Sequence, residues 1–449
     1  MKTSKLKILV ASALLFMTAS APALQPEVLY AFQAGSTNSN GAYPQAGLVL
    51  GRDGHFYGTT EGGGSNGDGT VFKVTRDGVL TTLVSFNGAN GSRPQAELLL
   101  SRDGSFYGTT IAGGSSGNGT VFQVTTSGAL TSLVSFSGAN GSYPQSALVL
   151  GSDGDLYGTT AFGGSSGFAG TVFRVTTNGI LTSLFSFTGD DGRHPSAGLV
   201  LDRDGNLFGT TPSTVFRVTT SGVLTTLVTF SGPNGSDQSG ELWLNSDGNF
   251  YGTTYHGGSS GIGTVFKITT NGTLATLVSF GAFGAGSLPV AGLVVGGDGN
   301  FYGTTAAGGS GGGLLGSGTV FKVTPNGVLT SLVSFNGTNG RGPNKLVLGP
   351  DGNLYGTTVS GGPGGGGTIF RLVISAFTRV ARQPGGSVLL TGNGPTNGAY
   401  SLWASTDLSL PVASWTLLTS HSFDSNGNFS YTDASAANNS SRFYQISVP

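Results

Sequence analysis

The sequence contains no cysteine, only four histidines and few charged side chains. Charged residues make up 9% of 449 residues and the formal net charge is −1, whereas about a quarter of the residues in an ordinary globular domain are charged. The absence of cysteine excludes disulfides and thiolate metal ligands. The Lys and Arg residues form no cluster that could displace counterions from phosphates, so a nucleic-acid partner is not expected.

Long apolar runs are also missing, apart from one at the beginning of the chain. Three lysines at positions 2, 5 and 7 precede the apolar run Ile8–Met17, which is too short to span a bilayer. The tripeptide Ala21-Pro22-Ala23 follows as a small-residue cleavage site. We therefore expect residues 1–23 to be a signal peptide that is removed after Ala23, and the mature protein to be secreted or held at the cell surface without a transmembrane segment.

Glycine is abundant instead, with 81 residues, and many of the glycines belong to a repeat. An Asp-Gly pair followed by Tyr-Gly-Thr-Thr, or Phe-Gly-Thr-Thr in one copy, occurs seven times. The aspartates are Asp53, Asp103, Asp153, Asp204, Asp247, Asp298 and Asp351, at intervals of 50, 50, 51, 43, 51 and 53 residues. The short interval reflects a deletion after Thr211, where "TTPSTVF" replaces a glycine-rich run.

Each repeat holds four short runs rich in Val, Leu, Phe, Tyr and Thr, separated by Gly, Asn and Asp, which is typical of antiparallel strands. Four strands repeated seven times predict an all-β fold: a seven-bladed β-propeller over residues 24–374, as a monomer. The segment Glu27–Phe32 resembles a fourth strand, whereas the last repeat stops after its third, Gly367–Ile374. We therefore expect the N-terminal strand to complete the last blade and close the ring.

The units of the form "DGxFYGTTxxGGSxGxGTVFKVTxxGxLTTLVSF" resemble the GloVer tandem repeat of exported, choice-of-anchor bacterial proteins. The resemblance covers roughly residues 27–374. It implies a secreted or surface-attached propeller and supplies no catalytic residues. Residues 375–449 contain further alternating strands, with Trp403, Trp415, Phe429 and Tyr444 as the expected core. They resemble the small immunoglobulin- or fibronectin-like β-sandwich found at the C-termini of other secreted bacterial proteins, which implies a stabilising or anchoring role.

Local motifs for chemistry are scarce. The seven aspartates suggest a calcium ring, but Ca²⁺ needs six to eight converging oxygens, so we interpret each aspartate as the cap of its own turn. The "GGSSGNG" loops lack the Lys-Ser/Thr ending of a phosphate-binding loop and are interpreted as flexible surface loops. The histidines have no metal-ligand spacing. We therefore expect no cofactor, no metal and no catalytic residue.

The connections between repeats and the glycine-rich loops are long, and strand alternation places all of them on one face. The residue before the proline of each connection should lie near the mouth of the central channel. These residues are Tyr43, Arg93, Tyr143 and His194, then Leu288 and Gly342. The first four are aromatic or hydrogen-bonding, as binding sites favour, although drift at exposed positions would give the same pattern.

Two functions remain open from the sequence. The first is a non-enzymatic binding or adhesion scaffold that recognises an extracellular glycan or matrix polymer through Tyr43, Arg93, Tyr143 and His194. The second is an extracellular polysaccharide hydrolase or lyase with its site at the same mouth. A pair of carboxylates, or a His-Tyr-Arg cluster, converging on the channel would favour the enzyme, and a shallow aromatic arc without titratable pairs would favour binding.

Overall fold

The computed structural model describes most of the chain and confirms that it is all-β with almost no helix. The described residues are 7–10, 24–35, 38–238, 240–281, 283–309, 316–394, 397–407, 414–425, 427–439 and 441–447. The expected leader, residues 1–23, lies outside them except for β1 (Lys7–Val10). No helix in these ranges is long and apolar enough to cross a membrane.

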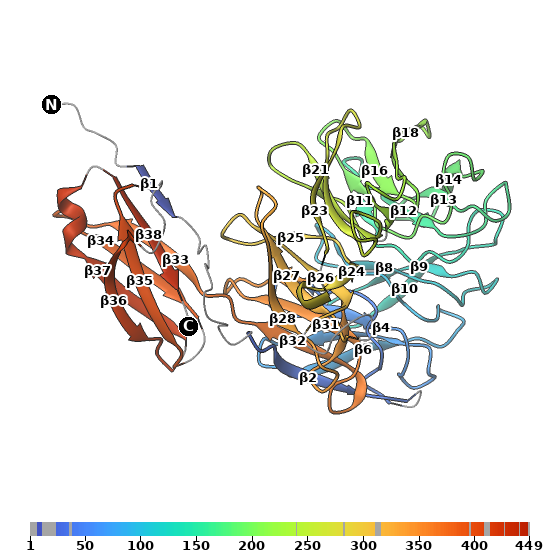
Figure 1. Cartoon of the computed structure of the whole chain (residues 1–449). Helices are drawn as coiled ribbons and strands as arrows, with labels where there is room; N and C mark the ends of the chain where they lie inside the picture. Colours follow the sequence, from blue (N-terminus) through green and yellow to red (C-terminus); the bar gives the residue numbers. More distant parts are fainter. Residues whose placement is uncertain are drawn as a thin grey trace.

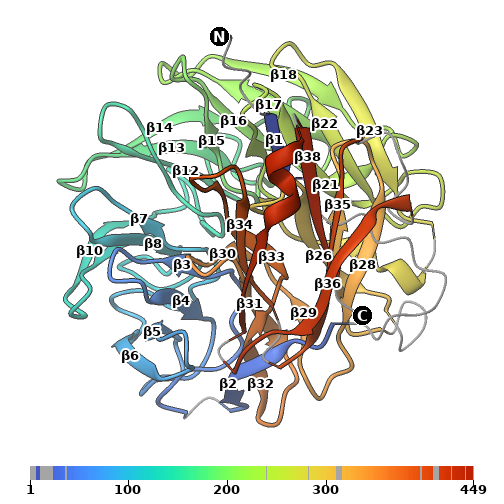
Figure 2. The ribbon, with the colours of Figure 1, turned by 90° about the vertical axis from the view of Figure 1, so that its left-hand side faces the viewer.

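Seven antiparallel sheets of four or five strands occupy residues 27–372, and they follow one another around a ring (Figure 2). The first three sheets each hold four strands. Their bounds are β3 (Val49–Leu50), β4 (Phe56–Thr60), β5 (Thr70–Val74) and β6 (Leu80–Ser85) in sheet 1; β7 (Leu99–Leu100), β8 (Phe106–Thr110), β9 (Thr120–Val124) and β10 (Leu130–Ser135) in sheet 2; and β11 (Val149–Leu150), β12 (Leu156–Thr160), β13 (Thr171–Val175) and β14 (Leu181–Ser186) in sheet 3.

The next three sheets continue this pattern, and two of them gain a short additional strand. Their bounds are β15 (Val200–Leu201), β16 (Leu207–Thr210), β17 (Thr214–Val218) and β18 (Leu224–Thr229) in sheet 4; β19 (Ser236–Gln238), β20 (Trp243–Leu244), β21 (Phe250–His256), β22 (Thr264–Ile268) and β23 (Leu274–Ser279) in sheet 5; and β24 (Ser287–Pro289), β25 (Val294–Val295), β26 (Phe301–Ala307), β27 (Thr319–Val323) and β28 (Leu329–Ser334) in sheet 6, with the 3₁₀ turn η1 (Phe283–Ala285) before β24.

Sheet 7 combines the two ends of the repeat region. It contains β29 (Arg341–Pro343), β30 (Val347–Leu348), β31 (Leu354–Ser360) and β32 (Gly365–Leu372), and its outer strand is β2 (Glu27–Gln33). The register runs from Glu27 opposite Arg371 to Gln33 opposite Gly365. The expected pairing of the N-terminal strand with the last repeat is therefore confirmed.

Sheets 7 and 1 also contact each other directly. Thr357 Oγ1 donates a hydrogen bond to the Ala46 carbonyl at 2.7 Å, and the rings of Tyr355 and Phe56 lie 4.3 Å apart. The same kind of contact joins neighbours elsewhere, as between Tyr57 and Phe106 at 4.2 Å. Each sheet thus buries its aromatic side chains against the next sheet, and the last buries them against the first.

The Asp-Gly pairs form the tight turns between the first and second strands. In sheet 1, Gly54 has φ +76°, Asp53 accepts a hydrogen bond from the backbone N–H of His55 at 3.2 Å, and the hydroxyl of Tyr57 donates to Asp53 at 2.8 Å. Partial removal from water and this hydrogen bond raise the pKa of the Tyr57 phenol. Six of the seven aspartates cap their turns in this way, as interpreted from the sequence. In sheet 4 the prediction is wrong, because Asp202 instead of Asp204 accepts from the Asn206 N–H. The contact with Asp53 also explains the Tyr of the repeat.

The glycine-rich loop of sheet 1 is packed at its base, a feature that the interpretation as a flexible surface loop did not include. Gly63 and Gly64 are buried, the Gly64 N–H donates to the Asn38 carbonyl at 2.7 Å, and the Gly69 N–H donates to the Gly63 carbonyl at 3.0 Å. A Cβ on Gly63 would lie 2.6 Å from the Cα of Gly41. Close approach to the preceding connection therefore requires these glycines.

Two further sheets follow sheet 7. One has the order β1-β38-β35-β36 and the other β33-β34-β37. Phe429 and Tyr444 belong to the core between them and Trp415 is buried, as expected, whereas Trp403 is only partly buried. The bounds are β33 (Ala376–Arg382), β34 (Val388–Asn393), β35 (Ala399–Ser405), β36 (Thr416–Ser422), β37 (Asn428–Asp433), β38 (Ser441–Ser447) and the 3₁₀ segment η4 (Ala434–Asn438).

These C-terminal sheets lie at one end of the ring (Figures 1 and 2). Asn393 donates a side-chain hydrogen bond to the carbonyl of Asp351, in the tight turn of sheet 7, and the Ile374 N–H donates to the side chain of Asn353 in the same turn at 3.1 Å. The C-terminal sheets therefore occupy the tight-turn face. The long connections face the opposite way and stay accessible.

We predict that deleting residues 27–33 destabilises the ring. β32 would become an exposed sheet edge, and the hydrophobic core between sheets 7 and 1 would lose Phe32. The melting temperature should fall by at least about 10 °C, or the protein should aggregate. The control is the chain that begins at Leu24 and keeps residues 27–33, and the deletion is made in this same chain. A deletion variant that melts with this control would contradict the role of β2.

Candidate functional site

The four residues proposed from the sequence occupy equivalent backbone positions on the long-loop face. Tyr43, Arg93, Tyr143 and His194 all have a positive φ, between +53° and +60°, which is uncommon for residues other than glycine. Asp237, Leu288 and Gly342 adopt the same conformation. Asp237 was missed because Gln238 stands where the other repeats have proline.

Inter-sheet hydrogen bonds explain this shared conformation. The Arg93 N–H donates to the Asp68 carbonyl, in the glycine-rich loop of sheet 1, at 2.8 Å, and the Tyr143 N–H donates to the corresponding Asn118 carbonyl at 3.1 Å. The conformation is therefore a requirement of the ring, and the identity of each side chain is left free.

Side-chain contacts unite only two of the four predicted residues. The rings of Tyr143 and His194 both pack on Phe162, at 5.5 and 4.7 Å between centroids, and His194 Nδ1 lies 3.0 Å from the Ala161 carbonyl. Arg93 instead pairs with Glu61 through its Nε at 2.8 Å. We call Tyr143, Phe162 and His194 the aromatic cluster; Tyr43 has no ring contact with it among the described residues.

Phe162 was missed by the sequence analysis, although a signal was present. The corresponding residues of the other long loops are Gly62, Ala112, His256, Ala307 and Ser360. With Phe162 this makes six equivalent positions, of which two, Phe162 and His256, carry large rings. His256 forms the second such group, because its Nδ1 lies 2.8 Å from an Asp237 carboxylate oxygen and its ring is 4.7 Å from that of Tyr255.

A small polar cavity lies at the centre of the ring. Its lining residues Gln45, Gln95 and Gln145 each follow one of the predicted residues Tyr43, Arg93 and Tyr143 by two positions. The cavity has a volume of about 150 Å³, and segments that precede the inner strands of all seven sheets line it. Amide side chains of Gln45, Gln95, Gln145 and Asn344 contribute to this lining. We call this cavity the vestibule. The four predicted residues are not part of its lining.

Three charged side chains converge at the floor of the vestibule. Lys345 Nζ lies 3.0 Å from a Glu97 oxygen and 2.6 Å from Glu241 Oε2. The three side chains are 21–26% exposed, and they come from sheets 2, 5 and 7. We call this group the waist. It was missed because nothing local to any of these residues marks it.

Small residues at the equivalent positions make room for the waist. These positions hold Gly47, Ala147, Gly198 and Gly292. A Cβ on Gly198 would lie 3.0 Å from Glu241 Oε1, and one on Gly47 would lie 2.8 Å from the Lys345 carbonyl. The channel at this level therefore accommodates three long side chains because the other positions carry almost none.

The waist has one more carboxylate than ammonium, and this imbalance affects its titration. Burial raises the pKa of Glu97, an effect that Lys345 opposes and Glu241 reinforces. Although burial alone would lower the pKa of Lys345, the two carboxylates hold it above its usual value. Lys345 is thus a permanent cation at neutral pH, and Glu97 binds a proton more readily than an ordinary glutamate.

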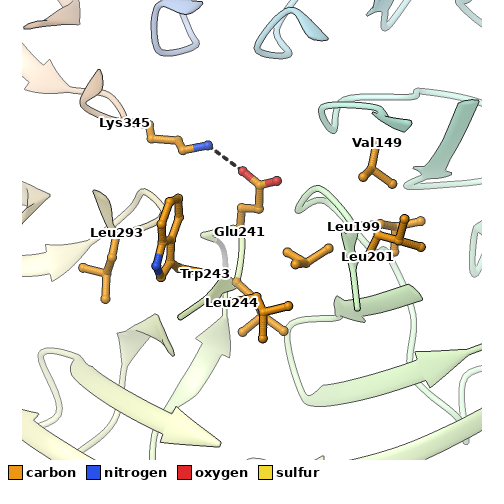
Figure 3. Close-up of a pocket in the computed structure, with 11 residues that line it drawn as sticks. Val149, Leu199, Leu201, Glu241, Trp243, Leu244, Leu293 and Lys345 are labelled. Atoms are coloured by element: carbon orange, nitrogen blue, oxygen red, sulfur yellow. Dashed lines mark hydrogen bonds and ion pairs between the residues drawn. The ribbon is translucent and has the colours of Figure 1, made fainter. Parts of the chain in front are cut away.

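A second, apolar cavity lies on the tight-turn side of the waist (Figure 3). Its volume is about 300 Å³. Glu241 and Lys345 border it, and its remaining walls include Val149, Leu199, Leu201, Trp243, Leu244 and Leu293. We call this cavity the lower pocket. The waist thus separates a polar space from an apolar one.

We predict that Lys345→Met lowers the free energy of unfolding by about 3 kcal/mol at neutral pH, because two carboxylates then face each other unpaired. The difference from the parent should shrink as the pH falls, because Glu97, whose pKa is raised, takes up a proton before an ordinary glutamate does. Denaturant unfolding of both proteins over a range of pH values measures this.

Glu97→Gln is the matched control for this variant. A raised carboxyl pKa means that the folded state binds the proton more tightly, so ionised Glu97 lowers stability as pH rises above its ordinary pKa. Glu97→Gln should therefore keep most of its stability at neutral pH and vary less with pH. Equal losses in the two variants would show that the waist does not act as one charged unit.

Comparison with known proteins places the repeats in a family. The Gloeobacter/Verrucomicrobia repeat model matches residues 14–214 and 212–401, and no curated protein matches. A solved streptogramin B lyase superposes with a TM-score of 0.53 and 16% identity over 78% of this chain and 96% of its own. The extracellular domain of a protein described as a hybrid two-component system of B. thetaiotaomicron gives a TM-score of 0.50 and 10% identity over 88% and 52%.

PorZ, described as a bacterial surface component of the type-IX secretion system of Porphyromonas gingivalis, gives a TM-score of 0.48 and 14% identity over 90% of this chain and 56% of its own. At such identities the streptogramin B lyase and the two-component-system domain indicate a propeller-like all-β fold alone. The sequence match is more specific, because it covers more than half of the chain. The chain therefore belongs to the Gloeobacter/Verrucomicrobia repeat family.

Proposed function

We propose that the protein is an exported, monomeric seven-bladed β-propeller with a C-terminal β-sandwich, over residues 24–374 and 375–449, that binds an extracellular glycan at its long-loop face. The observation that carries this proposal is the aromatic cluster on the long-loop face, in which Tyr143 precedes the vestibule residue Gln145 by two positions. Tyr143 is 45% exposed and Phe162 is 40% exposed, so their rings are open to the sugar faces on which aromatic side chains stack. We include Tyr43 and Arg93 in the same surface.

The polar groups around the vestibule favour a neutral glycan over an acidic one. Amides of Gln45, Gln95 and Gln145 can donate to and accept from sugar hydroxyls. The waist below them carries an excess negative charge, which would repel uronate or sulfate groups. The C-terminal sheets lie on the other face, so a long polymer could reach the vestibule without meeting them.

A polysaccharide hydrolase or lyase is the second candidate, and the waist supplies a specific observation in its favour. Glu97 and Glu241 form a carboxylate pair in the channel, and the pKa of Glu97 is raised, as a general acid requires. Lys345, however, lies between the two carboxylates and binds both. This occupies the space that a scissile bond would need, so binding is the function we favour.

A glycan array probed with the mature protein tests the proposal. Retention of neutral glycans and release of no reducing ends would support binding. Release of reducing ends or unsaturated products that is lost in Glu97→Gln would support the enzyme instead. Retention of acidic glycans only would contradict the assignment of the vestibule.

We predict that Tyr143→Ala combined with His194→Ala weakens glycan retention at least about 10-fold, because two of the three rings of the aromatic cluster are lost. The melting temperature should change little, since exposed positions contribute little to stability. Leu288→Ala is the matched control, because Leu288 has the same backbone conformation in sheet 6. Equal retention by the double variant and this control would show that the aromatic cluster does not bind the glycan.

We also predict that the exported protein begins at Leu24, because a cleavage site of the Ala-x-Ala type ends at Ala23. Intact-mass spectrometry of the protein recovered from the culture medium or cell surface measures this. A protein that still begins at Met1 would contradict export through a cleaved signal.

A further inference from the structure

The lower pocket carries side chains that the repeat does not require. At the channel-facing position of the inner strand, the other six sheets carry Val49, Leu99, Val149, Val200, Val294 and Val347, whereas sheet 5 has Trp243. Glu241, two residues before Trp243, and Lys345 also depart from the repeat, because they stand at a position where four sheets have Gly or Ala. All three border the lower pocket, so the departures converge on one space (Figure 3).

Trp243 brings an aromatic face to this pocket. Its indole Nε1 is buried and has no hydrogen-bond partner among the described residues. The pocket is therefore lined by the ring of Trp243 and not by its N–H group. The ring itself is the aromatic surface that binds cations most strongly.

The border of the pocket carries the charge that complements a cation. Glu241 uses Oε2 to bind Lys345, and its other oxygen points away from Lys345 (Figure 3). No described residue hydrogen-bonds to that second oxygen. Because Lys345 is already shared with Glu97, the group as a whole retains one uncompensated negative charge.

The walls of the pocket select against a fully hydrated ion. Leu199, Leu201, Leu244 and Leu293 enclose a space of about 300 Å³. A metal ion would keep its water there, because no group of three or more His, Cys, Asp or Glu side chains among the described residues is placed to hold one. An ammonium group with an apolar covering matches these walls better.

From this geometry we propose that the lower pocket binds a small alkylated ammonium compound, such as an amino alcohol or its ester, with the ammonium against the Trp243 ring and Glu241. The site is separate from the glycan-binding surface, because the waist lies between them.

Choline and 3,3-dimethyl-1-butanol test the proposal as a pair, because they share shape and hydroxyl and differ in charge. Isothermal titration of the mature protein should give a Kd for choline at least about 10-fold below that of the neutral alcohol. Trp243→Leu should weaken choline binding at least about 10-fold, and Glu241→Gln should abolish the preference for charge. Trp403→Phe, in the C-terminal sheet, is the matched control and should bind like the parent.

Independence from the glycan site is tested in the same experiment. The Tyr143→Ala, His194→Ala variant should bind choline normally even if its glycan retention is lost. Equal affinity for choline and the neutral alcohol would overturn the proposal in favour of a purely apolar pocket. Failure of choline to bind at about 10 mM, far above the concentration needed for a specific site, would overturn it outright. If Glu241→Gln does not fold, Trp243→Leu alone decides between these outcomes.

Discussion

A hydrogen bond between two buried threonine hydroxyls fixes the same point of every sheet. Thr60 and Thr70 form it in sheet 1 at 2.8 Å, and Thr211 and Thr214 form it in sheet 4 at the same distance. The pair joins the end of the second strand to the start of the third, so it closes the sheet before the loop begins. The loop in between can then lengthen, shorten or change sequence without moving the strands.

The consequences are visible in the loops themselves. Sheet 4 has only two residues between its threonines, whereas sheet 3 places a long loop with Phe162 between Thr160 and Thr171, whose hydroxyls are 2.8 Å apart. Both sheets keep the same register in their central strands. A rigid frame with variable loops is the usual basis of binding sites, and here the frame is set by one repeated hydrogen bond.

The sequence predicted the strands well because seven copies repeat the same pattern and each copy supports the others. It also predicted the pairing of Glu27–Phe32 with the last repeat, since a missing strand at one end matched an additional strand at the other. It was incomplete where packing decided the outcome. The glycine-rich loops looked flexible by composition, yet Gly63 and Gly64 are needed because another backbone lies too close for a side chain.

The candidate sites were predicted less completely, for a geometrical reason. Tyr143 and His194 could be found because they precede a proline in successive repeats, whereas Phe162 lies in a different loop and only the folded ring brings it between them. Lys345 and Glu241 are 104 residues apart in the chain. They occupy equivalent positions of the repeat, but the repeat does not predict that their side chains meet. Their contact depends on closure of the whole ring, which local sequence does not encode.

Departures from the repeat are nevertheless the better guide to function in such a chain. Seven copies of one unit show which residues the frame needs: the Asp of the turn, the paired threonines and the aromatic side chains between sheets. Glu97, Glu241, Trp243 and Lys345 meet none of these needs. The other four sheets carry Gly or Ala at the position that holds Glu97, Glu241 and Lys345. Burying charged side chains at such positions costs free energy unless they are paired. Their convergence at the axis, with one negative charge left over and one indole donor unpaired, is therefore harder to attribute to drift than four isolated substitutions at the surface would be.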